Sequence, residues 1–169
     1  MFTDVSEFSV CGKKVYLSSI IDSFNSEVVT YSVSIQGNLE LVLNTIDNLY
    51  QVLPETFYPQ YIHSDQGFQY QHEKYVKKLK ENHIIQSMSR KGNCWNNAIT
   101  EGFFSKLKTE FFYQEHFKSI SDFLKKLDEY IHYYNYERIK TSLGMSITNN
   151  FEFYMRLFHL FEYFIEIFL

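Results

Sequence analysis

The sequence predicts an α/β domain, a mixed sheet flanked by helices, and three observations support this. Residues 2–10 and 27–35 alternate apolar and polar side chains as half-buried strands do, and residues 15–24 between them are rich in β-forming side chains. The period then changes at Asn38, after which apolar residues recur every three or four positions, as in an amphipathic helix. Further on, two short apolar runs are separated by a helical segment, the order in which parallel strands are joined. A chain of 169 residues, 45% of them hydrophobic, is long enough for one domain with a true core.

The first three elements are expected to be consecutive strands. They are predicted over Phe2–Val10, Val15–Phe24 and Glu27–Ile35. Cys11–Lys14 separates the first pair, because Gly12 and adjacent charges interrupt both periods, and Asn25 with Ser26 separates the second pair. Tight turns between successive strands predict an antiparallel meander.

Helical periodicity and the two short apolar runs predict the remaining elements. Helices are expected over Asn38–Leu53, Gln71–Asn82, Asn96–Phe112 and Ser119–Ile139, and strands over Tyr61–Ser64 and Ile84–Met88. Asn38 is the expected cap of the first helix, and Ser119 or Ser121 caps the last. This order of elements is that of a ribonuclease-H-like α/β domain, which we expect over residues 1–146.

Composition restricts the class of function only weakly. The net charge is −4, whereas proteins that handle DNA usually carry a basic excess. The charge is unevenly spread, however, since residues 74–140 hold thirteen basic and eight acidic side chains. Phosphate contacts respond to the local patch, so the balance permits DNA binding. Two cysteines without metal-ligand spacing fit a reduced compartment, and no secretory signal is recognised.

Two stretches carry candidate chemistry. The first is G-N-C-W-N-N-A-I-T-E-G-F-F-S-K-L-K-T-E at 92–110, a helix that sets Glu101 and Lys108 along one stripe. A lone Glu on a helix is usually a solvated surface residue. The second stretch, Y-I-H-S-D-Q-G-F-Q-Y at 61–70, favours a functional interpretation, because Asp65 follows a short strand and open α/β sheets place their sites at such strand ends.

These stretches, with Y-N-Y-E-R-I-K-T at 134–141, resemble the integrase-core transposases of bacterial insertion sequences. More narrowly they are similar to the insertion-sequence-three family, relatives of retroviral integrases. That family has an Asp, Asp, Glu triad with 35 residues between the last two, and 35 residues separate Asp65 from Glu101 here. Its first Asp lies in T-D-[VI]-[ST]-E-F, which the T-D-V-S-E-F around Asp4 matches.

The resemblance implies that Asp4, Asp65 and Glu101 are the catalytic carboxylates and hold two Mg²⁺ ions, for which Mn²⁺ is expected to substitute. Attack on a phosphodiester needs the attacking and leaving oxygens stabilised together, and a pair of metal ions does this. Mg²⁺ prefers oxygen ligands from a few carboxylates. Glu7 is also acidic, but strand alternation puts it on the face opposite Asp4, so we leave it out of the triad.

Basic residues are the candidates for binding DNA. Lys108 stands seven positions after Glu101, where the family carries a basic residue, and is expected to meet a phosphate near the cleaved bond; the alternative is a surface pair at i, i+7. The other candidates for tracking the DNA backbone are Lys74, Lys77, Lys78, Arg90 and Lys91. A solvated surface is the equally weighted alternative for that group.

Two further residues flank the motifs. His63 is either a neighbour of the metal site or, as is commoner, a hydrogen-bonded structural histidine. Trp95 is either a core residue, which is commoner, or a platform on which bases stack.

The sequence also departs from the family pattern. Asn96 stands where the family usually has Asp, and Ile147 where it has Pro. The sequence starts just before Asp4, so the first strand is expected to lack its beginning. The helix-turn-helix region that the family carries upstream is likewise expected to be missing. Residues 147–169 form an apolar, helical tail in this prediction, and recurring charges in it argue against a membrane span.

Two hypotheses follow. In the first, the chain is a transposase catalytic core that cleaves DNA and transfers strands, in an active form or as an inactive remnant. Its expected partners are DNA (transposon ends and target) and further copies of itself, with no membrane, in a cytoplasmic, nucleoid-associated location. In the second, it is a non-catalytic DNA-binding or regulatory fragment that pairs with full-length transposase. Metal-dependent chemistry at the triad distinguishes the two.

Overall fold

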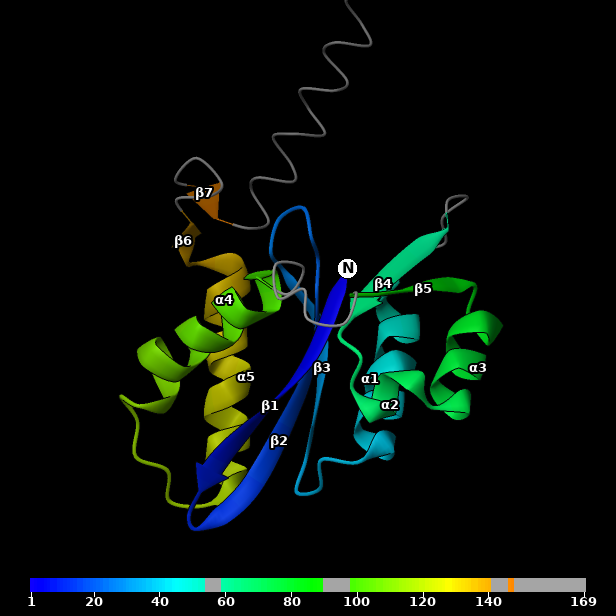
Figure 1. Ribbon diagram of the computed structural model, residues 1–169. Helices are drawn as coiled ribbons and strands as arrows, with labels where there is room; N and C mark the ends of the chain where they lie inside the picture. Colours follow the sequence, from blue (N-terminus) through cyan, green and yellow to red (C-terminus); the bar gives the residue numbers. More distant parts are fainter. Residues whose placement is uncertain (54–58, 90–97, 141–145, 148–169) are drawn as a thin grey trace, which may run out of the picture.

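The computed structural model describes residues 1–53, 59–89, 98–140 and 146–147. Its centre is a five-stranded sheet in the order β3-β2-β1-β4-β5 (Figure 1). The strands are β1 (Phe2–Val10), β2 (Lys13–Ile21), β3 (Val28–Ser34), β4 (Gln60–Ser64) and β5 (Ile84–Met88). The first three are antiparallel, and β1, β4 and β5 run parallel to one another. The predicted α/β class and element order are confirmed.

The β1–β2 hairpin is tighter than the sequence predicted. Its turn consists of Cys11 and Gly12 alone, whose φ angles of 50° and 74° are both positive, as in the mirror-image turns that match strand twist. β2 therefore begins at Lys13 instead of Val15, and Val10 pairs with Lys13. All nine residues of β1 have a partner on β2.

The contact between β1 and β4 is short. In the parallel ladder Phe2 is the one β1 residue paired with β4, opposite His63. The amide of His63 also donates a hydrogen bond of 2.9 Å to the carbonyl of Met1. The predicted missing beginning of the first strand concerns positions ahead of Met1 and stays a prediction.

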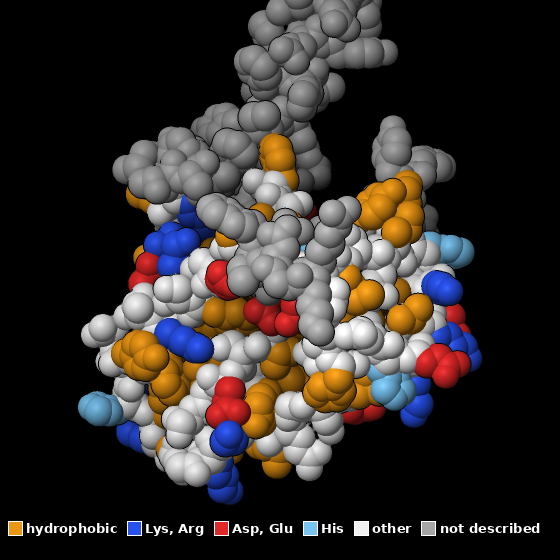
Figure 2. All heavy atoms as spheres, in the orientation of Figure 1, with side chains coloured by type: hydrophobic (Ala, Val, Ile, Leu, Met, Phe, Trp, Pro, Cys, Tyr) orange, Lys and Arg blue, Asp and Glu red, His pale blue; other side chains and the backbone are white. Residues whose placement is uncertain are grey.

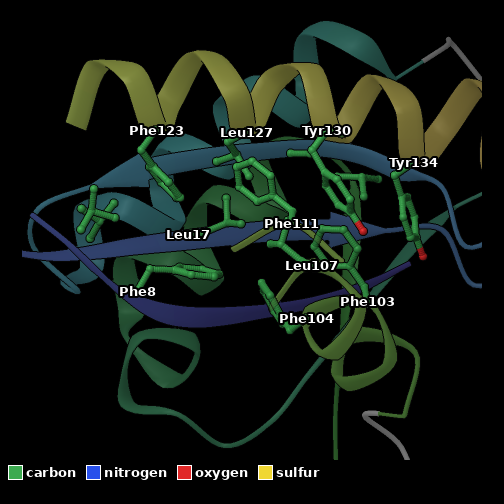
Figure 3. Packing of buried hydrophobic residues seen from close by; sticks show 14 of the residues in the cluster. Phe8, Leu17, Phe103, Phe104, Leu107, Phe111, Phe123, Leu127, Tyr130 and Tyr134 are labelled. Carbon is green, nitrogen blue, oxygen red and sulfur yellow. The ribbon is translucent and has the colours of Figure 1, made fainter. Parts of the chain in front are cut away.

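Helices cover both faces of the sheet. They are α1 (Leu39–Val52), α2 (Phe68–Gln71), α3 (Glu73–Glu81), α4 (Ala98–Lys106), the π-helix η2 (Leu107–Phe112) and α5 (Ile120–Tyr136). Alternation along β1 separates two cores: Phe8 packs with α4, η2 and α5, as Figure 3 shows, whereas Val5 packs against the cluster that includes α1 and α3. The two cores together make a three-layer arrangement with the sheet in the middle.

Three predicted helices differ in detail. The helix expected over 71–82 corresponds to α3, which starts at Glu73 because His72 adopts an extended backbone and caps α3 by accepting from Lys74 N–H. The single-turn helix α2 ahead of it was not predicted. The helix expected over 96–112 is α-helical to Lys106 and then continues as η2, while residues 96 and 97 lie outside the described ranges. α5 is capped by Ser119, one of the two predicted alternatives, but the helix ends at Tyr136 and not at Ile139 as predicted.

Short strands take the place of the predicted end of the last helix. Ile139–Lys140 (β6) pairs antiparallel with Ser146–Ile147 (β7). Lys140 is buried, and its Nζ donates to the carbonyl of Ser26 at 2.9 Å and lies 3.9 Å from the ring centroid of Tyr134.

A buried amide fixes α5 to the sheet. The side chain of Asn135 accepts a hydrogen bond from the Val28 amide and donates one to the Val28 carbonyl, both 3.0 Å long. β3 is an edge strand, so no neighbouring strand pairs with its outer side. Asn135 takes the place of such a neighbour by pairing with both backbone groups of Val28.

The predicted apolar tail at 147–169 lies outside the described residues, except for Ile147. Among the helices that the structure describes, none has both the length and the apolar character needed to cross a membrane.

Candidate active site

Asp4 lies in the middle of the sheet, on the face of β1 that carries Phe8. Its side chain is half-buried, and its Oδ1 accepts a hydrogen bond of 2.7 Å from the Val5 amide. The pKa of Asp4 is raised to about 6, mainly by burial and also by the charges of Asp65 and Glu101, although the hydrogen bond from Val5 opposes the rise. Glu7 points to solvent and pairs with Lys14 at 3.0 Å, on the other face, as alternation predicts.

Asp65 directly follows β4, so it lies at the carboxyl end of a strand parallel to β1. Its Oδ1 accepts a hydrogen bond of 2.8 Å from the Gly67 amide, which closes a small turn around the carboxylate. A Cβ at position 67 would lie 3.0 Å from that oxygen and 2.8 Å from Nε2 of Gln69. A side chain at position 67 would therefore crowd the Asp65 carboxylate and Gln69, and glycine leaves both in place.

Glu101 lies in the first turn of α4 and is exposed. Helix α4 packs against β1, which brings its first turn to the side of the sheet that Asp4 faces. Since both Asp65 and Glu101 act on the pKa of Asp4, the three carboxylates share one region of the molecule. Three separate elements, β1, the turn after β4 and α4, thus converge there. Figure 2, drawn in the orientation of Figure 1, shows acidic side chains (red) close together near the centre of the face turned to the viewer.

Lys108 joins this region from the π-helix η2. Its charge partly offsets the rise in the pKa of Asp4, and its Nζ lies 5.5 Å from the ring centroid of Phe8, two side chains along β1 on the same face. Glu110, also in η2, forms hydrogen bonds of 2.8 and 2.6 Å with Nε and Nη2 of Arg138, which ties the segment carrying Lys108 to the end of α5.

The donor chemistry of the site fits a divalent cation. Asp4, Asp65 and Glu101 offer oxygen ligands, which Mg²⁺ prefers, and the mutual repulsion of their charges is what such a cation relieves. Within the part of the chain that the structure describes, however, no three His, Cys, Asp or Glu side chains are close enough to hold a metal ion. Asp4 and Asp65 are each turned toward a backbone amide instead, so binding requires the carboxylates to move together.

The three lysine candidates on α3 do not join the carboxylates. Lys74, Lys77 and Lys78 lie on α3, which packs in the layer opposite α4. Lys78 faces α1, where it pairs with Asp47 and donates to the carbonyl of Leu43, and Lys77 pairs with Glu81 at 3.8 Å. Arg90 and Lys91 lie outside the described residues.

His63 takes a structural position near the site. Its Nδ1 and Nε2 lie 3.0 and 2.9 Å from the hydroxyl oxygens of Ser87 and Ser89, so both ring nitrogens have a partner on or next to β5. Burial lowers its pKa. Trp95 lies outside the described residues.

Sequence reasoning missed Tyr70, a buried residue of α2 in the core cluster on the Val5 side of the sheet. Its hydroxyl is buried, and the charges of Asp4 and Asp65 both act on it. In the sequence Tyr70 looks like an ordinary aromatic core residue, so the influence of Asp4 and Asp65 on it becomes visible only in the folded chain.

Comparison with known proteins gives the same assignment as the motifs. An integrase core domain model matches residues 1–94, and a second integrase core domain model matches residues 101–152. A protein of Escherichia coli (strain K12) named as a transposase for insertion sequence element IS150 is 48% identical over 141 residues, which are 83% of this chain and 50% of that protein. A transposase-like protein of Haemophilus influenzae is 45% identical over 148 residues, 87% of this chain and 68% of that one. The chain therefore spans half the length of the Escherichia coli relative.

Solved structures share the fold at low identity. The catalytic core domain of BIV integrase aligns with a TM-score of 0.65 and 16% identity, over 94% of this chain and 96% of that one. The HTLV-2 integrase catalytic core domain in complex with magnesium aligns with a TM-score of 0.59 and 16% identity, over 82% of this chain and 86% of that one. The predicted ribonuclease-H-like fold of retroviral integrase cores is thereby confirmed. With its motifs, its sheet order and these matches, the chain belongs to the integrase core domain family, among the transposases of bacterial insertion sequences.

Proposed function

We propose that this chain is the catalytic core of a DNA transposase, which cleaves a phosphodiester bond and transfers the freed strand with the help of divalent metal. The observation that carries the proposal is geometric: β4, which precedes Asp65, runs parallel to β1, which carries Asp4, and α4, which carries Glu101, packs on β1. The raised pKa of Asp4, to which both other carboxylates contribute, supports it. Relatives named as transposases and the magnesium complex of the HTLV-2 integrase core support it.

Asp4, Asp65 and Glu101 would hold Mg²⁺, or Mn²⁺ in its place. A pair of such ions, when bound, stabilises the attacking and the leaving oxygen of an in-line displacement. The carboxylates come from three separate elements, β1, the turn after β4 and α4. In the cleavage step the oxygen of water bonds to phosphorus and the bond to the 3′-oxygen breaks, which leaves a 3′-hydroxyl. In strand transfer the oxygen of that 3′-hydroxyl bonds to the phosphorus of a second phosphodiester and loses its proton, while the bond from that phosphorus to its own 3′-oxygen breaks and the departing oxygen takes up a proton.

Lys108 supplies positive charge to the same region. Its Nζ lies 5.5 Å from the ring centroid of Phe8, and its charge lowers the pKa of Asp4. Both observations support a role in which Lys108 would contact a non-bridging oxygen of the phosphate being cleaved. The lysines of α3 lie in the other layer of the fold, and they would at most contact DNA away from the cleaved bond. Phosphate contacts carry little sequence information, so we expect the DNA affinity of this chain to be non-specific and to fall as salt rises.

The further proposals concern assembly and location. Dimeric and trimeric forms are described for the HTLV-2 integrase core, and we propose that this chain also forms homo-oligomers on DNA, in a cytoplasmic, nucleoid-associated setting.

The test is nicking of supercoiled plasmid in Mg²⁺ or Mn²⁺, with chelator as the metal-free control. We expect metal-dependent nicking that Glu101→Gln abolishes and that Glu7→Gln, which removes an exposed carboxylate on the other face of β1, leaves within about twofold. Equal nicking by the native chain and Glu101→Gln would overturn the assignment. No nicking by a folded chain that still binds DNA would favour the non-catalytic DNA-binding or regulatory role.

A further inference from the structure

Ser89 follows β5 and is the last described residue before α4, the helix that carries Glu101. It is buried, and its amide, its hydroxyl and its carbonyl all contact the segment around Asp65. The amide donates a hydrogen bond of 3.1 Å to the carbonyl of Ser64, and the hydroxyl oxygen lies 2.9 Å from Nε2 of His63. Ser89 is thus fixed against the end of β4.

The third contact of Ser89 comes from the side chain of Gln66. Its Nε2 donates a hydrogen bond of 3.0 Å to the Ser89 carbonyl. Gln66 is an exposed residue, and water would satisfy the amide of an exposed glutamine equally well. Here the amide turns back to a buried residue, whose carbonyl is costly to leave unpaired. The carbonyl of Gln66 is held in turn, because it accepts from Nε2 of Gln71.

Asp65 lies between the two residues that hold the backbone of Ser89. Ser64 accepts from the Ser89 amide on one side of Asp65, and Gln66 donates to the Ser89 carbonyl on the other side. We call these two hydrogen bonds the Ser89 bracket. The backbone of Asp65 cannot shift relative to Ser89 without breaking one of them. On this fixed backbone, the hydrogen bond from the Gly67 amide orients the carboxylate.

We propose that Gln66 is a positioning residue of the carboxylate site, which ties the turn that carries Asp65 to Ser89, the residue from which the chain leaves the sheet toward Glu101. The inference rests on the proposed function. Asp65 and Glu101 belong to different elements, and Ser89 is the point from which both segments are held. A misplacement of about 1 Å in a catalytic group is costly, so a bond that fixes the Asp65 backbone affects the rate without touching substrate.

Gln86 provides a matched control. Its Nε2 donates a hydrogen bond of 2.7 Å to the carbonyl of Tyr70, so it also joins the segment after β4 to β5 through a glutamine amide and a backbone carbonyl. Both bonds are partly buried. They differ in place, since the Gln86 bond ends on α2 and the Gln66 bond flanks Asp65. Methionine has a similar length to glutamine and donates no hydrogen bond, so it removes either bond with little change in shape.

The first experiment compares Gln66→Met and Gln86→Met in the full chain without metal. Hydrogen exchange of the Ser89 and Gly67 amides is measured by NMR, together with the melting temperature. We expect Gln66→Met to speed the exchange of both amides by about fivefold or more, because one bond of the Ser89 bracket is lost. Gln86→Met should leave both within about twofold. The two variants should melt at similar temperatures, because each loses one bond of the same kind.

The second experiment measures the rate at which the same variants nick supercoiled plasmid in Mg²⁺, over a range of plasmid concentrations. Gln66→Met should lower the rate at saturating plasmid by about tenfold or more. The plasmid concentration for half-maximal rate should stay unchanged, because positioning is lost and DNA binding is not. Gln86→Met should keep both quantities within about twofold of the native chain.

The outcomes separate this inference from the function on which it rests. Equal exchange of the Ser89 and Gly67 amides in the two variants would overturn the role of Gln66 and leave the proposed function intact. Faster exchange in Gln66→Met with an unchanged nicking rate would also overturn it, because the bond would then be purely structural. A folded native chain that does not nick DNA would overturn the proposed function, and the exchange comparison would still decide whether Gln66 holds the Asp65 turn.

Discussion

The amide of Gly67 donates a hydrogen bond of 2.8 Å to Oδ1 of Asp65, and this contact holds the carboxylate at the end of β4. The glycine has an ordinary φ of −54°, so its requirement comes from space and not from backbone conformation. In the D-Q-G sequence at 65–67, the glycine leaves room for the Asp65 carboxylate.

Gly67→Ala is expected to displace the Asp65 carboxylate, because the new Cβ would lie 3.0 Å from Oδ1. We predict at least about a tenfold loss in the nicking rate, since small misplacements of catalytic groups are costly. Gly102→Ala is the control: in α4 its Cβ meets only Nζ of Lys106, at 3.9 Å. That variant should gain about 0.5–1 kcal/mol in stability, because alanine is the better helix former. Equal nicking rates for the two variants would show that the turn does not position Asp65.

Asp4→Asn is expected to stabilise the chain in the absence of divalent metal. The pKa of Asp4 is raised to about 6, so above that pH its charged form is disfavoured by the fold, and an amide removes the penalty while it still accepts from Val5. We predict a gain of about 1 kcal/mol at pH 8 in chelator, measured by urea unfolding. Added Mg²⁺ should stabilise the native chain and not the variant. A variant less stable than the native chain in chelator would contradict this electrostatic account.

Asn135→Ala is expected to destabilise the fold strongly. It leaves the buried amide and carbonyl of Val28 without their partner, and each unpaired buried group costs about 1–3 kcal/mol. We predict a loss of about 2–4 kcal/mol in the free energy of unfolding. Asn48→Ala removes exposed contacts with Tyr31 and Ser32 and should cost less than about 1 kcal/mol. Similar losses for the two variants would mean that the two hydrogen bonds between Asn135 and Val28 contribute little to stability.

Lys140 is expected to make stability rise with pH above neutrality. Burial, with the charges of Arg138 and Lys106, lowers its pKa to about 7, against an ordinary value of 10.5. Between these values the unfolded chain binds a proton that the folded chain has released, so raising the pH favours folding. Relative to Lys140→Met, the native chain should gain about 1–2 kcal/mol between pH 7 and pH 9. A constant difference across this range would refute the lowered pKa.

Local patterns predicted most of the fold and the positions of the carboxylates. Alternation along β1 predicted that Asp4 and Glu7 lie on opposite faces. The choice of Asp65 and Glu101 came from the family spacing, and their catalytic role stays a prediction. Helix caps also followed from local chemistry, since Asn38 and Ser119 each accept from an amide of the first turn of their helix.

Features that depend on tertiary contacts were not predictable in this way. Lys78 looked like a surface cation, but its neighbour α1 offers Asp47, and the lysine turns there. The end of α5 shortened because Arg138 reaches Glu110 and Lys140 is buried against Ser26, contacts between residues far apart in the sequence. Tyr70 has no local pattern that distinguishes it from a core aromatic, and the influence of Asp4 on its pKa exists only in the folded chain.

The most direct test of the account is anomalous diffraction from crystals grown with Mn²⁺. The account predicts a Mn²⁺ peak bounded by carboxylate oxygens of Asp4, Asp65 and Glu101, with the Asp4 and Asp65 side chains turned away from the amides of Val5 and Gly67 that they now accept from. In crystals of Glu101→Gln the peak should weaken or vanish. A fully occupied peak elsewhere, with the three carboxylates unchanged, would contradict the central claim that they form one metal site.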